Sequence, residues 1–221
     1  EVDLIEDVSI AYGFENFKEE IPNVATIGEE EPIEIFKRKI SNLLVGLGMI
    51  ETYTPCLTNK QNQSEKSNLK LDLIDVMNPA NEEYTSLRRL LFPSLIEVIS
   101  NNKHNEYPQN LFEIGKVFDF GKSETGTIEK EILSVLLCSK EADFTRIKQV
   151  LEYIMSNLGL AFVMEEDSHP SFINGRCASV KVNGKGIAIL GEIQPQVLEN
   201  WELEVPTVVM ELNLSELFLA L

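Results

Sequence analysis

The chain has 221 residues, of which 43% are hydrophobic and 25% charged, so its composition is that of a folded globular protein and excludes wholesale disorder. Nineteen basic and 36 acidic side chains give a formal net charge of −17. A surface this negative repels phosphates and anionic lipids, so we do not expect the chain to be the main binder of a nucleic acid or a membrane.

The cysteines indicate a reducing compartment. Cys56, Cys138 and Cys177 lie far apart, and an odd, scattered set is typical of reduced thiols in a cytoplasmic protein. No apolar stretch approaches the roughly 20 residues that a membrane span needs. Because Glu1 lies inside a segment with helical periodicity, we expect a piece of a longer polypeptide.

The first predicted element is a helix, because Leu4, Val8 and Ala11 have amphipathic spacing. Gly13 is expected to end this helix. Residues 21–31 contain Pro22 and several acids without a period, which indicates a linker.

A second helix is predicted after Pro32, where one apolar stripe is followed by Gly46 and Gly48. The stripe consists of Ile33, Phe36, Ile40, Leu43, Leu44 and Leu47. The following stretches predict a strand over residues 50–57, a polar loop over 58–68 and a strand over 69–76.

The remaining elements alternate between helices and strands. The apolar run 132–138 predicts a strand buried on both faces, and Asn183-Gly184 predicts a hairpin turn. The other expected elements are helices over 90–102, 144–158, 194–201 and 215–219, and strands over 111–118 (interrupted at Gly115), 162–164, 177–182, 187–193 and 207–212. Together they predict an α+β fold with a mostly antiparallel sheet flanked by helices.

The sequence contains no phosphate-binding glycine loop, zinc HExxH motif or serine nucleophile elbow. His104 and His169 are the only histidines, which excludes a histidine-rich metal site. We interpret both as surface or loop residues, although spacing alone leaves a Ser-His-Asp triad open because triads assemble in space.

Asp3, Glu6 and Asp7 form the sharpest cluster of candidate ligands. On a helix these three carboxylates share one face, where they repel one another unless a hard cation such as Mg²⁺ or a basic partner neutralises them. The alternative, which spacing alone favours, is that acids near a helix N-terminus complement its dipole.

Two other segments attract attention. In residues 78–89 a turn and two acids, Glu82 and Glu83, precede Arg88 and Arg89. The arginines suit a phosphate or carboxylate clamp, but they equally suit ion pairs with the two glutamates or a partner's surface. Residues 169–176 and Gly191-Glu192-Ile193 have turn residues with structural explanations and require no catalysis.

These segments together resemble one family. Residues 3–14 (DLIEDVSIAYGF) resemble the signature that ends a small domain of the phenylalanyl-tRNA synthetase beta subunit. The archaeal and eukaryotic form of that subunit is similar, in the same order, to residues 85–91, 112–118, 169–176, 191–193 and 197–201, and to Pro206.

The resemblance implies three parts: the end of a B5-like helical domain (residues 1–20), a linker (21–31), and a core similar to a class II aminoacyl-tRNA synthetase domain (32–221). Residues 32–57 would stand in the place of motif 1, an interface element, and 78–118 in the place of motif 2. We find no motif 3 arginine, so we assign no catalytic or nucleotide-binding residue.

The implied function is a non-catalytic scaffold of phenylalanine–tRNA ligase. The implied partner is an alpha subunit that uses ATP to activate phenylalanine and charges tRNA, in a cytoplasmic (alpha-beta)2 heterotetramer that contacts tRNA as a whole complex and does not involve a membrane. Asp3, Glu6 and Asp7 match three of the family's acids for Mg²⁺ shared with the alpha subunit, and a fourth, an upstream aspartate, would precede Glu1.

Two alternatives remain open from the sequence. One is a stand-alone class II-like enzyme that activates a small carboxylic acid with ATP through Arg88 or Arg89. The other is an acidic protein-interaction module that shares only the fold.

Overall fold

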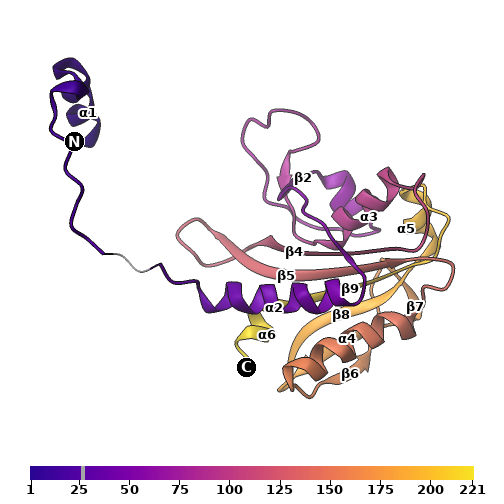
Figure 1. The fold of residues 1–221 in the computed structure, drawn as a ribbon. Helices are drawn as coiled ribbons and strands as arrows, with labels where there is room; N and C mark the ends of the chain where they lie inside the picture. The colour runs from indigo at the N-terminus through magenta and orange to yellow at the C-terminus, as the bar shows by residue number, and fades with distance from the viewer. Residues whose placement is uncertain (26–27) are drawn as a thin grey trace. The chain divides into compact units, whose positions relative to one another are not determined.

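The computed structural model describes residues 1–25 and 28–221, so two positions of the predicted linker, 26 and 27, lie outside the described residues. Over the described residues the chain divides into two compact units, Glu1–Glu31 and Pro32–Leu221 (Figure 1).

The first unit consists of one helix and a short turn. Helix α1 (Val2–Tyr12) ends at Gly13 as predicted, because the positive φ of 93° there turns the chain and the Gly13 N–H bonds the last carbonyls. A 3-10 turn, η1 (Phe14–Asn16), follows. None of the eleven residues of α1 is buried within the described chain.

The second unit is built on a seven-stranded sheet, counted over the described residues, with the strand order β1-β4-β5-β9-β8-β7-β6. Only the edge pair β1–β4 is parallel among its described pairs, so the predicted α+β fold with a mostly antiparallel sheet is confirmed. The strands are β1 (Ile50–Glu51), β4 (Gln109–Phe120), β5 (Thr127–Cys138), β6 (Val163–Glu166), β7 (Phe172–Val182), β8 (Lys185–Ile193) and β9 (Thr207–Asn213).

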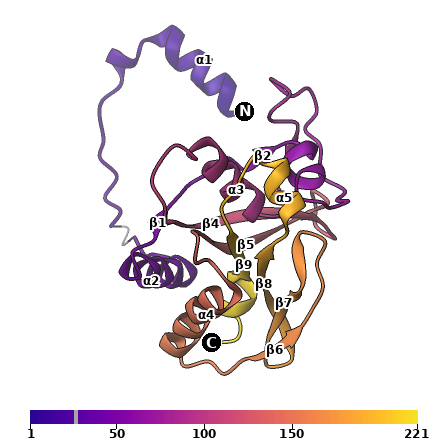
Figure 2. The ribbon, with the colours of Figure 1, turned by 90° about the vertical axis from the view of Figure 1, so that its right-hand side faces the viewer.

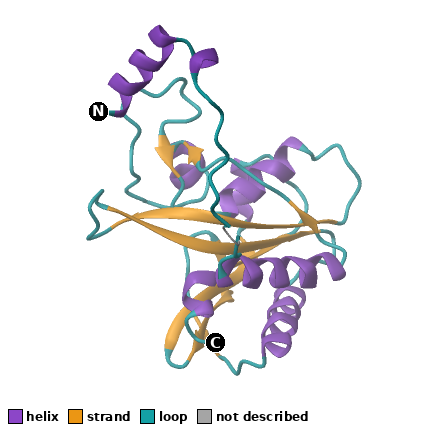
Figure 3. Cartoon of the chain, turned by 60° about the vertical axis from the view of Figure 1, so that its left-hand side comes forward, coloured by secondary structure: helices purple, strands orange, loops and turns teal. Residues whose placement is uncertain are grey.

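Helices cover both faces of this sheet (Figures 2 and 3). One face packs against α2 (Pro32–Gly46), α4 (Phe144–Leu158) and α6 (Leu214–Phe218). The other packs against α3 (Phe92–Asn101) and α5 (Pro195–Asn200). Outside the sheet lie the π-helical turn η2 (Gln61–Glu65) and the small pair β2 (Leu57–Thr58) and β3 (Ser86–Leu87).

Strand β5 confirms the prediction of burial on both faces. Leu133, Val135 and Leu137 point into the core beneath α2 and α4, whereas Leu136 and Cys138 point into the core beneath α3. The side chains of a strand alternate between the faces of a sheet, so a continuous apolar run contributes to two cores.

The predicted hairpin at Asn183-Gly184 is also confirmed. It joins β7 to β8, and its two residues have φ values of 52° and 78°. Both values lie in the left-handed region, which Asn and Gly tolerate at low cost.

The strands predicted over residues 50–57 and 69–76 are wrong. The first is only β1 and the start of β2, since Pro55 between them has no N–H for a ladder. The second predicted strand, residues 69–76, forms only an isolated β-bridge, from Asp75 to Ser86. The N–H groups of Leu69 and Leu71 bond to Ser64 in η2, which lies inside the predicted loop 58–68.

Gly115 does not interrupt its strand. Strand β4 runs unbroken through Gly115, which lies opposite Ile132 on β5. No helix in the described part of the chain combines the length and apolar character that a bilayer crossing requires.

Candidate functional site

A row of three polar side chains crosses the middle of the sheet. Glu113 on β4 lies opposite Ser134 on β5, which lies opposite Glu211 on β9. Directly opposed residues point to the same face of a sheet, here the face beneath α3, so the three side chains are neighbours. Glu113 and Ser134 are fully buried.

The chain itself neutralises Glu113. The Nη1 atom of Arg88 lies 2.8 Å from Glu113 Oε1, and the two side chains are only 1% and 0% exposed. Thr54 Oγ1 donates to the other carboxylate oxygen at 2.6 Å. Both oxygens of Glu113 therefore have partners within the protein.

The donors of Arg88 are also engaged internally. Its Nε donates to the carbonyl of Lys116 at 2.8 Å, and Nη1 donates to Thr54 Oγ1 at 2.7 Å as well as to Glu113. A guanidinium recognises a carboxylate or phosphate through free N–H groups presented as a fork. With these groups held by backbone and side chains of its own chain, Arg88 is a structural residue.

Gly115 makes room for this guanidinium. A Cβ atom at position 115 would collide with Nη2 of Arg88 and would lie 3.0 Å from Glu113 Oε1. The glycine in the middle of β4 is therefore explained by the close approach of Arg88, not by a break in the strand.

Arg89 forms a more exposed ion pair. Its Nη2 lies 2.9 Å from Asp119 Oδ1, and Nη1 donates to the carbonyl of Asp72 at 3.2 Å. The suggested pairing of the two arginines with Glu82 and Glu83 is therefore wrong, since their partners are Glu113 and Asp119.

Glu211 closes the other end of the row. Its Oε1 accepts from the N–H groups of Leu91 and Phe92, both at 2.6 Å, where α3 begins. A helix N-terminus favours a negative charge. Desolvation is nevertheless the larger effect and raises the pKa of Glu211 to about 7.

Helix α3 covers the sheet face on which the row lies. Its buried side chains Phe92, Leu95, Ile96 and Ile99 share one core with β-strand residues of that face. Ser134 Oγ, between the two glutamates, is buried and has no hydrogen-bond partner among the described atoms. The row is consequently a polar seam beneath α3, in which Glu113 and Ser134 are fully buried and Glu211 is half-buried.

Asp3, Glu6 and Asp7 lie on α1 and are exposed. Nowhere in the described residues do three His, Cys, Asp or Glu side chains lie together in a way that could hold a metal ion. The three carboxylates share a helix face but do not by themselves form a ligand set that fits Mg²⁺.

The ring of His169 packs against two phenylalanine rings. Its centroid lies 4.9 Å from that of Phe172 and 6.4 Å from that of Phe92, and burial lowers its pKa. Its Nδ1 accepts from the Ser171 N–H at 3.3 Å. These contacts give His169 a packing role at the start of the segment 169–176.

Sequence reasoning did not single out Glu113, Ser134 or Glu211. The available signal was a glutamate inside an otherwise apolar strand, at position 113 between Phe112 and Ile114 and at position 211 between Met210 and Leu212. A charge at a core position requires a buried partner, so such a glutamate predicts a polar network.

Comparisons with known proteins show the family to which this chain is similar. A family model described as the phenylalanyl tRNA synthetase beta chain CLM domain matches residues 18–214. The phenylalanine–tRNA ligase beta subunits of Pyrococcus abyssi and Pyrococcus horikoshii are 44% and 42% identical over 218 residues. Each alignment covers 98% of this chain and 39% of the relative, so the chain spans about two fifths of the length of these curated relatives.

The beta subunit of Methanococcus maripaludis is 38% identical over 221 residues, covering 97% of this chain and 40% of that protein. Among solved structures, a pyrrolysyl tRNA synthetase from Desulfitobacterium hafniense superposes with a TM-score of 0.69 at 17% identity. That match covers 85% of this chain and 68% of the other, and it shows a shared fold.

Proposed function

Because this chain belongs to the family of phenylalanyl-tRNA synthetase beta chains, we propose that it is a non-catalytic scaffold within a phenylalanine–tRNA ligase. In this proposal an alpha subunit activates phenylalanine with ATP and charges tRNA. The chain described here provides a surface that binds the alpha subunit and stabilises the conformation of that subunit.

The polar seam supports this proposal most strongly. A small-molecule site is a cleft of about 300–1,000 Å³ with a few free polar groups aimed into it. Here α3 packs on the sheet face above Glu113, Ser134 and Glu211, and Nε and Nη1 of Arg88 donate to groups inside the chain. The Nε and Nη1 groups of Arg88 are thus not available to a nucleotide phosphate, which weighs against the stand-alone enzyme.

The docking surface is proposed on α2, β1 and the residues that follow them, the place of the predicted interface element. Edge strand β1 is only two residues long, and its outer side has no described partner strand. Exposed apolar side chains gather on these elements: Ile35, Val45, Leu47, Ile50 and Tyr53. Such groups on a soluble protein mark protein–protein contacts.

The experiment is to mix the chain with the alpha subunit of the same organism and measure the molar mass by light scattering. We expect a complex, and we expect the double variant Ile50→Asp/Tyr53→Asp to weaken it by more than about tenfold. The matched control is Ile128→Asp, an exposed isoleucine on β5. Monomers that persist at micromolar concentration contradict the proposal.

A second measurement addresses the enzyme alternative. We expect no ATP–pyrophosphate exchange from the chain alone. Exchange by the purified chain would overturn the scaffold proposal.

The finer features of the assembly are also proposals. We propose an (alpha-beta)2 heterotetramer in the cytoplasm that contacts tRNA through the whole complex. We also propose that Asp3, Glu6 and Asp7 contribute to a Mg²⁺ site completed by groups outside this chain, since the chain alone lacks a full ligand set. Calorimetry with Mg²⁺ and the alpha subunit tests this, because Asp3→Asn should remove the binding heat that Glu15→Gln leaves unchanged.

A further inference from the structure

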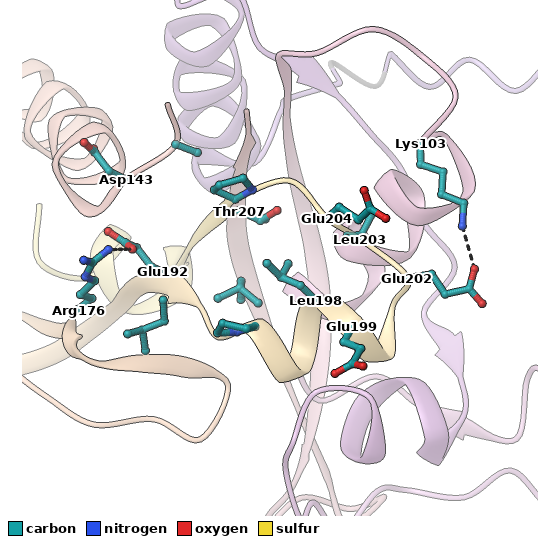
Figure 4. Close-up of a pocket in the computed structure, with 15 residues that line it drawn as sticks. Lys103, Asp143, Arg176, Glu192, Leu198, Glu199, Glu202, Leu203, Glu204 and Thr207 are labelled. Carbon is teal, nitrogen blue, oxygen red and sulfur yellow. Dashed lines mark hydrogen bonds and ion pairs between the residues drawn. The ribbon is translucent and has the colours of Figure 1, made fainter. Parts of the chain in front are cut away.

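A groove of about 740 Å³ lies away from the polar seam, between the start of α4, the start of β7, the end of β8, and helix α5 with the segment after it (Figure 4). Its apolar lining comprises the buried or half-buried side chains of the floor and two exposed prolines. The floor consists of Ile173, Ile193, Leu198 and Leu203, and the prolines are Pro195 and Pro206. A cavity of this size with an apolar floor holds several side chains of a ligand.

Acidic groups dominate the rim of the groove. The lining has five acidic and two basic side chains. The two basic ones are already paired, Lys103 with Glu202 at 2.8 Å and Arg176 with Glu192 at 2.6 Å.

Three other carboxylates of the rim take no part in these two salt bridges. Asp143, Glu199 and Glu204 form no salt bridge within residues 1–25 and 28–221. The groove therefore carries an excess of negative charge, and it repels nucleotides, tRNA phosphates and free carboxylates.

The charges are arranged at two ends of an apolar middle. Figure 4 shows Asp143 near the Arg176–Glu192 pair at one end, and Glu199 and Glu204 near the Lys103–Glu202 pair at the other. Leu198 and Thr207 lie between these ends. A matching ligand is positive at both ends and apolar in the centre.

Two carboxylates at one end of the groove are held in place by hydrogen bonds within the chain. Asp143 accepts from the Arg146 N–H at 2.8 Å as the N-cap of α4, and Glu192 accepts from the Phe144 N–H at 3.0 Å. Groups that are already held in place lose little entropy when a ligand binds, so more of the contact energy appears as affinity.

We propose that this groove binds a segment of a partner protein in which basic residues flank an apolar side chain. The apolar side chain lies on the floor near Leu198, and the basic residues reach Asp143 at one end and Glu199 and Glu204 at the other. This inference does not depend on the proposed scaffold function, because its test uses no alpha subunit.

The probe is a fluorescein-labelled peptide, Gly-Arg-Lys-Leu-Lys-Arg-Gly, and the measurement is fluorescence anisotropy with the full chain. We expect saturable binding that weakens about tenfold when the central leucine is replaced by glycine. The charge-reversed peptide Gly-Glu-Glu-Leu-Glu-Glu-Gly should not bind. Unlabelled spermidine, which has the charge but no apolar side chain, should compete only at about tenfold higher concentration than the unlabelled peptide.

Two double variants locate the binding site. Glu199→Lys/Glu204→Lys should weaken binding by about tenfold or more, because both residues are exposed on the rim. Glu152→Lys/Glu166→Lys changes the net charge equally at exposed positions outside the groove and should leave the affinity within about twofold. Equal losses in both variants, or equal affinity for the leucine and glycine peptides, would overturn the proposal.

Discussion

Arg88 and Glu113 are both buried, and each neutralises the charge of the other. An isolated buried charge is costly, whereas a buried pair with further hydrogen bonds is tolerated. Thr54 and the carbonyl of Lys116 supply those further bonds. The pair therefore contributes to the structure of the seam, and its removal should affect folding before it affects any reaction.

We predict that Glu113→Ala lowers the free energy of unfolding by about 3–5 kcal/mol, because it leaves the Arg88 guanidinium buried without a counter-charge. Urea unfolding measures the change. Asp119→Ala is the matched control, since it removes the carboxylate that pairs with the partly exposed Arg89 and should cost less than about 1 kcal/mol. Equal losses in the two variants would show that burial does not set the cost.

Glu211 should make stability depend on pH. Burial raises the pKa of Glu211 to about 7 in the folded chain, whereas an unfolded glutamate titrates near 4.3. The folded state thus holds the proton more tightly, so the contribution of this group is full below about pH 4 and is lost as the pH rises through 7. From about pH 5 to about pH 8 we predict a loss of about 3 kcal/mol relative to Glu211→Gln.

Urea unfolding of both proteins across this pH range measures the difference. The glutamine variant does not titrate at position 211, so it serves as the reference for every other ionisable group. A difference between the two proteins that stays constant with pH would show that Glu211 is already ionised at about pH 5.

At the scale of elements, β4 is shaped by a contact between Gly115 and Arg88, which lies 27 positions earlier in the chain. Gly115 has an ordinary strand pairing with Ile132, but the guanidinium of Arg88 occupies the place where a side chain would begin. Strand β4 can therefore accept the buried arginine only at a residue without Cβ.

We predict that Gly115→Ala lowers the free energy of unfolding by about 1–3 kcal/mol, the usual cost of overpacking a core. Gly186→Ala, on β8, is the matched control, because a Cβ there meets no atom within 4 Å. Thermal and urea unfolding of both variants measure this. In a protein that already carries Arg88→Met, the further change Gly115→Ala should not lower the free energy of unfolding. That result would confirm the collision with the guanidinium as the cause.

Elements fixed by local chemistry were predictable from the sequence, and elements fixed by distant partners were not. The Asn183-Gly184 turn and the end of α1 at Gly13 depend on backbone conformations that these residue types adopt readily. The segment 69–76 has the alternation of a strand, but the N–H groups of Leu69 and Leu71 bond to Ser64, which no periodicity reveals. The polar seam was missed for the same reason, because it joins residues from β4, β5 and β9.

At the scale of the whole molecule, the two units differ in how they bury apolar surface. Every buried hydrophobic side chain among the described residues belongs to Pro32–Leu221. In the first unit, large apolar side chains such as Leu4, Val8 and Phe14 are 65–69% exposed. A helix of eleven residues with no buried face is marginal in water, so its stability must come from groups outside its own unit.

We predict that residues 32–221, produced alone, unfold cooperatively with a free energy within about 1 kcal/mol of the full chain, because both cores and the polar seam lie inside this range. The measurement is urea unfolding followed by tryptophan fluorescence, since Trp201 is buried in the core beneath α3. Circular dichroism of a peptide covering residues 1–20 completes the test, and we expect little helix in isolation. A shortened chain that loses several kcal/mol would show that the first unit stabilises the second, and the division into separate units would then be wrong.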